Sequence, residues 1–261
     1  MRKQWLALAC SLAMVPVALP VIAHGDEANT DETKAEKAWD IEVEASYLLK
    51  NGNSESESVV GKASASHDGE KWRQSAKAEA VNSISESEDS GDEERTAERY
   101  YASYKLDRKL ADNYYLFNAL TYEKDRFSGY QYQASYAFGL GRRFIDTDTQ
   151  TLDLEAGPGY RVQCLEPDTS YFHCSDSEDS VIARVAGKYK WKINDVASFG
   201  QDIITEIGEE NTSLRSETSL TSKISTHFAM RLSYLLTRDS YVPAGTHKTD
   251  TETTVSLVYT F

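Results

Sequence analysis

The chain ends in residues 253–261, TTVSLVYTF, which alternate between two faces up to the last position. One face carries Thr253, Val255, Leu257, Tyr259 and Phe261, and the other carries Thr254, Ser256, Val258 and Thr260. The last residues of a soluble chain are usually frayed and polar. This alternation is instead typical of a β-strand that is paired to its end. The final strand therefore needs a partner strand elsewhere in the chain.

The same two-residue period recurs from Trp39 onward and predicts about twelve strands. The connections between them alternate in length. The short ones are 67–71, 107–112, 145–150, 193–195 and 226–227, and the mostly longer ones include 85–94, 163–179 and 239–249. Outer-membrane barrels alternate short periplasmic turns with longer extracellular loops. An even strand count then places both termini in the periplasm.

In hydrocarbon no backbone group can remain unpaired, so a sheet must close and its last strand must pair with its first. We therefore predict an all-β fold, a transmembrane antiparallel up-and-down barrel over residues 39–261. Leu257, Tyr259 and Phe261 then resemble the C-terminal assembly signal of bacterial outer-membrane barrels. The sixteen tyrosines suit the aromatic girdles of such barrels. The alternative is an exposed last strand in a soluble β-sandwich.

The first residues predict export. Met1-Arg2-Lys3 is basic, and residues 5–23 are almost entirely apolar or small, which is typical of a signal peptide (1–23) cleaved between Ala23 and His24. An N-terminal membrane anchor is the alternative, although Pro16 and Pro20 interrupt it. Residues 24–38 are charged and lack aromatics, so we predict a disordered acidic periplasmic leader. The predicted location is the cell outer membrane.

Two cysteines remain after cleavage, Cys164 and Cys174. Because an exported chain folds in an oxidising compartment, we predict a disulfide between them, with two free thiols as the alternative.

Two predicted loops are acidic. Their acids are Glu86, Glu88, Asp89, Asp92, Glu93 and Glu94 in the first, and Glu166, Asp168, Asp176, Glu178 and Asp179 in the second. They could form a cation-collecting mouth or a weak divalent-cation site that bridges to lipopolysaccharide phosphates. Alternatively they are solvated loops that keep the surface soluble.

Charged residues also occupy the predicted inner face. They are Glu42, Glu44, Lys77, Glu79, Arg99, Lys105, Asp153, Glu155, Arg161, Arg184, Lys188, Arg215, Glu217 and Arg231. An Arg or Lys facing lipid at mid-membrane costs about 2–4 kcal/mol, so these side chains should point inward. Barrels of eight strands have a filled interior, and barrels of sixteen strands have an aqueous channel. Twelve strands lie between the two, so these charges either line a narrow wet channel or fill the barrel with ion pairs.

The stretches LTYEKDRFSGYQYQASYAFGLGRRF (120–144) and LEAGPGYR (154–161) resemble a salt-induced outer-membrane protein family of unknown function. The resemblance extends to GNSES (52–56), 214–225 and 249–261, and it implies location and fold but no solute or reaction. Its most specific residues are Tyr122, Glu123, Asp125, Arg126 and Phe127. They form a candidate gate or binding site at the barrel mouth, or an ion-paired turn that fixes strand register.

Other function classes lack support in the sequence. The histidines at 24, 67, 173, 227 and 247 fall in the leader, turns or loops without a serine–acid partner, so no enzyme and no cofactor is predicted. A net charge of −14 and the lack of a basic patch argue against nucleic-acid binding. We expect a monomer that contacts outer-membrane lipids and lipopolysaccharide, and the barrel-assembly machinery during insertion. Its function would be a narrow passive channel that favours cations, or a non-conducting structural barrel. A soluble secreted β-protein is the third alternative.

Overall fold

The computed structural model describes residues 39–50, 56–86, 93–126, 128, 130–167, 174–242 and 247–261. Its regular elements are twelve strands. They are β1 Asp40–Lys50, β2 Ser56–Asp68, β3 Trp72–Glu86, β4 Glu93–Lys109, β5 Tyr114–Asp125, β6 Tyr132–Asp146, β7 Gln150–Pro167, β8 Cys174–Lys192, β9 Ala197–Gly208, β10 Thr212–Lys223, β11 Phe228–Asp239 and β12 Thr249–Thr260. Among these residues there is no helix of the length and hydropathy needed to cross a membrane.

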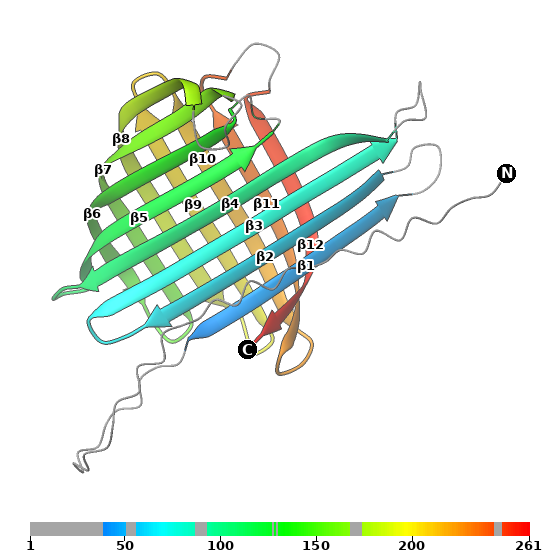
Figure 1. Cartoon of the computed structure of the whole chain (residues 1–261). Helices are drawn as coiled ribbons and strands as arrows, with labels where there is room; N and C mark the ends of the chain where they lie inside the picture. The colour runs from blue at the N-terminus through cyan, green and yellow to red at the C-terminus, as the bar shows by residue number, and fades with distance from the viewer. Residues whose placement is uncertain are drawn as a thin grey trace, which may run out of the picture. The chain divides into compact units, whose positions relative to one another are not determined.

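Each strand pairs antiparallel with its neighbours in sequence, and β12 returns to β1, so the sheet is a closed barrel (Figure 1). Four residue pairs form the closing seam between β1 and β12, from Glu42↔Thr260 to Ala45↔Leu257. The Phe261 N–H adds a hydrogen bond of 3.1 Å to the carbonyl of Ile41. The final strand is therefore paired to its last residue, and the predicted closed antiparallel barrel of twelve strands is confirmed.

The barrel has two distinct ends. The turn end carries the connections 69–71, 110–113, 147–149, 193–196 and 224–227, together with the start of β1 and the end of β12. The loop end carries the other six connections. At the turn end, Asp112 and Asn113 have φ of 58° and 65°, which Asp and Asn tolerate better than most residues.

Several strands extend further than their apolar pattern predicts. The predicted loop 163–179 is mostly a ribbon of β7 and β8, in which Gln163 pairs with Glu178 and Pro167 with Cys174. Backbone pairing does not require apolar side chains, so the ladder continues beyond the apolar band. Glu86, Glu93, Glu94, Asp176, Glu178 and Asp179 consequently lie in strands, not in loops.

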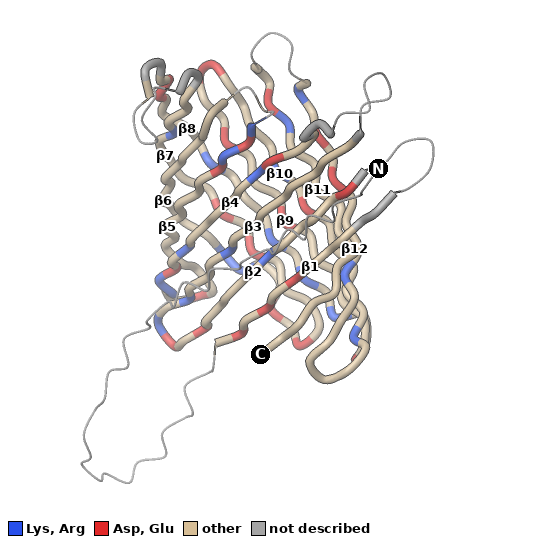
Figure 2. Tube along the Cα trace, turned by 45° about the vertical axis from the view of Figure 1, so that its right-hand side comes forward, with Lys and Arg blue, Asp and Glu red and all other residues tan. Residues whose placement is uncertain are grey.

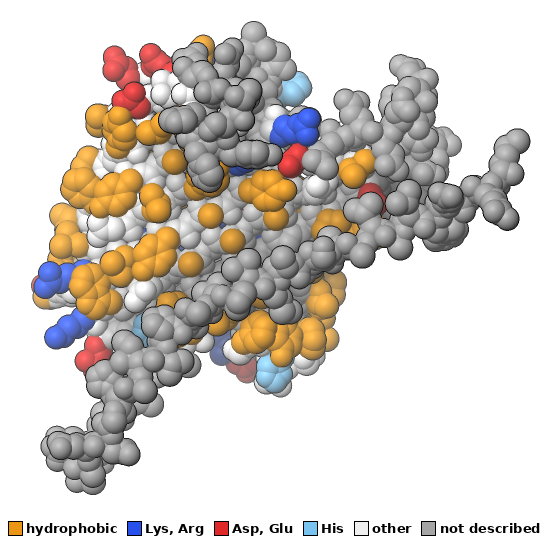
Figure 3. Space-filling model, viewed as in Figure 1, with side chains coloured by type: hydrophobic (Ala, Val, Ile, Leu, Met, Phe, Trp, Pro, Cys, Tyr) orange, Lys and Arg blue, Asp and Glu red, His pale blue; other side chains and the backbone are white. Residues whose placement is uncertain are grey.

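The outer face of the barrel is apolar. Large exposed side chains include Phe138, Leu140, Leu154, Val181 and Val185. On the face shown in Figure 3, the charged side chains gather near the ends of the barrel, and apolar and uncharged side chains cover the region between.

The inner face is polar with one apolar cluster, Tyr115, Phe117, Ala119 and Ala137. In this cluster Tyr115 and Phe117 point inward, against glycines of β6, so β5 carries apolar side chains on both of its faces.

Candidate functional site

All fourteen predicted inner charges lie on the inward face of the barrel, whose interior we call the lumen. Directly paired residues of neighbouring strands share a face of the sheet, so the inward face can be followed from strand to strand. Lys77, for example, is opposite Ser64 and Ser103, and Arg184 is opposite Glu206. Figure 2 shows charged residues distributed along the strands as well as at the ends. The charges form three layers between the turn end and the loop end.

The middle layer crosses the lumen, and we call it the central bridge (Lys62, Lys77, Glu79, Arg215 and Glu217). Glu217 of β10 pairs with Lys77 of β3 and, at 3.0 Å between Nζ and Oε1, with Lys62 of β2. Arg215 of β10 pairs with Glu79 of β3 at 2.6 Å. In the ring of twelve strands, β3 and β10 are five steps apart, so these pairs connect nearly opposite walls.

The central bridge is tightly enclosed. The side chains of Lys62 and Glu79 are only 3% and 1% exposed. Arg99 extends the layer by pairing with Glu252 at 2.6 Å and with Glu79 at 3.4 Å. The Arg215 guanidinium also lies 4.1 Å from the ring centre of Tyr101. Paired charges can be buried where unpaired ones cannot, so this layer can close the middle of the lumen.

The layer near the turn end is filled on one side only. There Arg73 pairs with Asp107 at 2.7 Å and with Asp153 at 3.1 Å, and Lys105 pairs with Glu155 at 2.5 Å. Across β8 and β9 the lumen is open instead: Lys188 and Asp202 pair at 3.4 Å, yet their side chains are 49% and 38% exposed. Water therefore reaches the inside of the barrel on this side.

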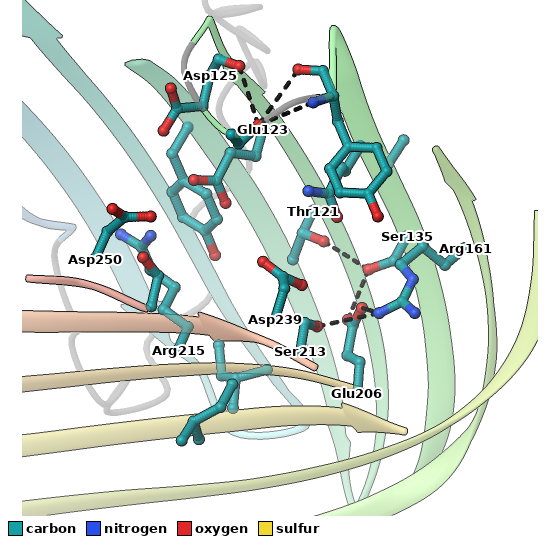
Figure 4. Close-up of a pocket in the computed structure, with 18 of the residues that line it drawn as sticks. Thr121, Glu123, Asp125, Ser135, Arg161, Glu206, Ser213, Arg215, Asp239 and Asp250 are labelled. Atoms are coloured by element: carbon teal, nitrogen blue, oxygen red, sulfur yellow. Dashed lines mark hydrogen bonds and ion pairs between the residues drawn. The ribbon is translucent and has the colours of Figure 1, made fainter. Parts of the chain in front are cut away.

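The third layer surrounds a cavity of about 90 Å³ toward the loop end (Figure 4). On one wall, Glu206 accepts hydrogen bonds from Ser135 at 2.7 Å and from Arg184 at 3.1 Å. Arg161 on the same wall donates to the carbonyl of Asn211 at 2.5 Å and to Ser213 at 3.1 Å. The remaining charged lining residues are Arg215, Glu123, Asp125, Asp239 and Asp250. Acids outnumber arginines around this cavity.

The predicted mouth motif divides between two faces. Glu123 and Asp125 line the cavity. Tyr122 points outward and stacks on Tyr132, with ring centres 6.0 Å apart, and Arg126 pairs with Glu98 at 3.5 Å. Phe127 lies outside the described residues. The motif thus supplies two residues to a common site and does not form one by itself.

Residues from three loop-end connections meet beside this cavity. The Asn211 side chain accepts hydrogen bonds from the backbone N–H groups of Ser240 and Tyr241 at 3.0 and 3.2 Å. The Tyr130 hydroxyl donates to the carbonyl of Tyr241 at 3.4 Å. Tyr130 is almost fully buried, and burial, reinforced by the nearby charge of Asp239, raises its pKa to about 12.

The other predicted sites are placed as follows. Cys164 and Cys174 form a disulfide that joins β7 to β8. The rings of Tyr259 and Phe261 are in edge contact at 4.7 Å on the outer face, at the seam. Ala23, His24, Glu88, Asp89, Asp92 and Asp168 lie outside the described residues, and so does the whole predicted leader. In the described part of the chain, no group of His, Cys, Asp and Glu is arranged to hold a metal ion.

Several lumen residues were missing from the sequence prediction, among them Lys62, Arg73, Asp202, Glu206 and Asp239. The alternation that identified the other charges also places these residues on the inner face. What the sequence could not supply is the pairing across the lumen, because the two partners are more than a hundred residues apart in pairs such as Lys62–Glu217.

The family described as "Protein of unknown function, DUF481" matches residues 43–261. The uncharacterized protein YdiY of Escherichia coli (strain K12) is 30% identical over 230 residues, which make up 88% of this chain and 86% of that protein.

Among solved structures, the translocator domain of the autotransporter NalP from Neisseria meningitidis has a TM-score of 0.47 at 11% identity, covering 88% of this chain and 90% of that one. An outer-membrane channel from Pseudomonas putida F1 also has a TM-score of 0.47, at 10% identity, covering 89% of this chain and 100% of that one. The salt-induced name stays a prediction. The family match over residues 43–261 and the 30% identity to YdiY nevertheless show that the chain belongs to the DUF481 family of proteins of unknown function.

Proposed function

We propose that this protein is an outer-membrane β-barrel that forms a narrow passive channel for small ions and solutes, with its loop end facing the outside of the cell. Membrane insertion is supported by two features together. A closed ring leaves no unpaired sheet edge, and its outer face exposes large apolar side chains such as Leu140 and Val181. In water such a surface would promote aggregation.

The observation that carries the channel proposal is the hydrated pair Lys188–Asp202. Both side chains point into the barrel, and both are more than one-third exposed. Space wide enough for water therefore surrounds both charged groups, and charged groups strongly favour water in such a space. A cavity lies toward the opposite end. Between the two, the obstruction is made of side chains and not of backbone, and side chains can move aside for a small hydrated ion.

The alternative is a non-conducting structural barrel. The tight enclosure of Lys62 and Glu79 in the central bridge favours it. In that case the ion pairs would hold the walls together and the lumen would transmit nothing. The two proposals agree on fold and location, and they differ only in whether the central bridge lets ions pass.

A conductance measurement separates them. The predicted mature chain, residues 24–261, is refolded in detergent and inserted into a planar bilayer, beside Glu217→Ala. The substitution removes the carboxylate that binds both Lys62 and Lys77, so these two ammonium groups repel each other and attract water. We expect discrete openings in the parent protein and severalfold larger ones in the variant.

Glu210→Ala, at an exposed turn of the loop end, is the matched control and should leave the conductance unchanged. Folding of every variant is checked by the change in gel mobility on boiling. Folded parent and Glu217→Ala proteins that both stay silent would overturn the channel proposal and leave the structural one.

A further inference from the structure

Most charges in the lumen are neutralised by a partner, and the exceptions differ between the two ends. Among the described inward-facing residues, six lack an opposite charge of the described chain within 4.0 Å. Toward the loop end these are Glu178, Asp239 and Asp250, and toward the turn end they are Asp40, Lys190 and Lys223. The loop end thus has three unpaired negative charges. At the turn end, Asp40 and the second acid on Arg231, which pairs with both Glu42 and Glu44, offset the unpaired Lys190 and Lys223.

The charges around Lys190 make one wall of the turn end locally basic. Lys188, Lys190 and Lys192 follow one another on the inward face of β8 and are all exposed. Lys188 pairs with Asp202 and Lys192 with Asp195, so Lys190 is the member of this column without an ion pair within 4.0 Å among the described residues. The charges of Asp202, Glu42 and Asp40 act on it from further away.

The central bridge separates the two ends and is itself almost balanced. It contains three cationic groups, Lys62, Lys77 and Arg215, against the carboxylates of Glu79 and Glu217. The lumen therefore has a negative segment toward the loop end, a narrow and nearly neutral middle, and a nearly balanced segment toward the turn end.

From this arrangement we infer that the lumen rectifies ionic current: it passes cations from the loop end to the turn end, and anions in the opposite direction, more readily than the reverse. The inference rests on the proposed channel function. Cations accumulate beside the negative segment, whereas the balanced segment admits cations and anions alike. When the loop-end side is at positive voltage, both kinds of ion are driven toward the central bridge, and the narrow part fills with carriers. The opposite voltage draws both kinds away and empties it.

The effect depends on salt in a predictable way. The Debye length is about 10 Å at 0.1 M and about 3 Å at 1 M ionic strength. At the lower salt the wall charges act over distances comparable to a narrow lumen, and at the higher salt they are screened before they reach its axis. Rectification should therefore be clear in 0.1 M KCl and absent in 1 M KCl.

The test is the current–voltage curve of single channels in symmetric KCl. Their orientation is assigned with a Thr237→Cys background. This residue lines the cavity toward the loop end, so a charged thiol reagent added to one chamber changes the current only when the loop end faces that chamber. We expect the current at the loop-end-positive voltage to exceed the opposite current by about twofold in 0.1 M KCl, and the two to be equal in 1 M KCl.

Variants test which charges are responsible. Lys190→Glu with Lys223→Glu makes both ends acidic, and should abolish the asymmetry while making the channel more cation-selective. Glu178→Gln with Asp250→Asn should reduce it, and leaves Asp239 and its hydrogen bond to Asn211 in place. Asp148→Asn, in an exposed turn outside the lumen, is the control and should change nothing.

Channels with equal currents at both polarities in 0.1 M KCl, or with the larger current at the turn-end-positive voltage, would overturn the inference while leaving the channel proposal intact. A folded barrel that carries no current at all would overturn both. The two failures are thus distinguishable.

Discussion

At the scale of single residues, the packing of the inner wall beside Tyr115 depends on two glycines of β6, Gly139 and Gly141. A Cβ atom placed on Gly141 would lie 2.2 Å from the Tyr115 ring, well inside van der Waals contact. The space at Gly139 is equally restricted, because a Cβ there would lie 2.3 Å from the carbonyl oxygen of Ala156. Glycine at these positions lets the rings of Tyr115 and Phe117 lie against the wall, where they also contact Arg73 and Lys105.

We therefore expect Gly141→Ala to lower the free energy of unfolding by about 1–3 kcal/mol, the usual cost of overpacking a closely packed interior. The measurement is urea unfolding of the refolded barrel. Gly61→Ala is the matched control, since a Cβ at that outward-facing position meets nothing within 4 Å and should change stability by less than about 0.5 kcal/mol. Equal stability of the two variants would contradict this account of the inner wall.

At the scale of elements, the loop-end connections hold one another through Tyr130. This residue lies between β5 and β6, and its hydroxyl binds the carbonyl of Tyr241 in the connection between β11 and β12. Its pKa of about 12 exceeds the ordinary value of about 10 for an unfolded chain. Between these values the unfolded chain releases a proton that the folded protein keeps, so the contribution of Tyr130 to stability is complete below pH 10 and is lost as the pH rises toward 12.

The prediction is a difference between two proteins. From pH 9 to pH 11, the parent should lose about 1 kcal/mol more of its free energy of unfolding than Tyr130→Phe, which has no proton to release. Urea unfolding at the two pH values measures this difference, and the other tyrosines contribute equally to both proteins. Parallel losses would mean that the Tyr130 hydroxyl is not buried in solution.

The elements also show what the sequence could and could not predict. Alternation identified the strands and their inward faces. A register shifted by one residue would have moved every inward charge to the apolar outer face, so only one register fits the pattern. Strand ends were harder to place: polar stretches such as 174–180 have no apolar face, and only the pairing with β7 shows that they are strand. The cavity was not predictable, since its lining comes from strands distant in sequence, such as β5, β7 and β11, and depends on the closed ring to bring them together.

At the scale of the whole molecule, the seam is the least extensive strand pairing. Four residue pairs join β1 to β12, against eleven that join β1 to β2. Phe261 contributes a backbone hydrogen bond to Ile41 and a ring contact with Tyr259 at this seam. The closure of the ring should therefore be sensitive to the last residue.

Deleting Phe261 should lower both the refolding yield and the temperature at which the heat-modifiable gel band disappears. Phe144→Ala is the control: this ring is also exposed on the outer face, but it belongs to β6, away from the seam, and its loss should have a smaller effect. If the two variants behave alike, the deletion acts through lost apolar surface and not through ring closure.

The central bridge has a mechanical consequence. A hollow cylinder made of one sheet resists shear along its strands but flattens easily, because small changes of twist between neighbouring strands accumulate around the circumference. Lys62, Lys77 and Glu217 join nearly opposite walls and so act as struts across the cylinder. In the proposed membrane location, they would fix its cross-section against the lateral pressure of the surrounding lipid. A barrel without them would be expected to become more oval, and its cross-section would vary with the thickness and tension of the bilayer around it.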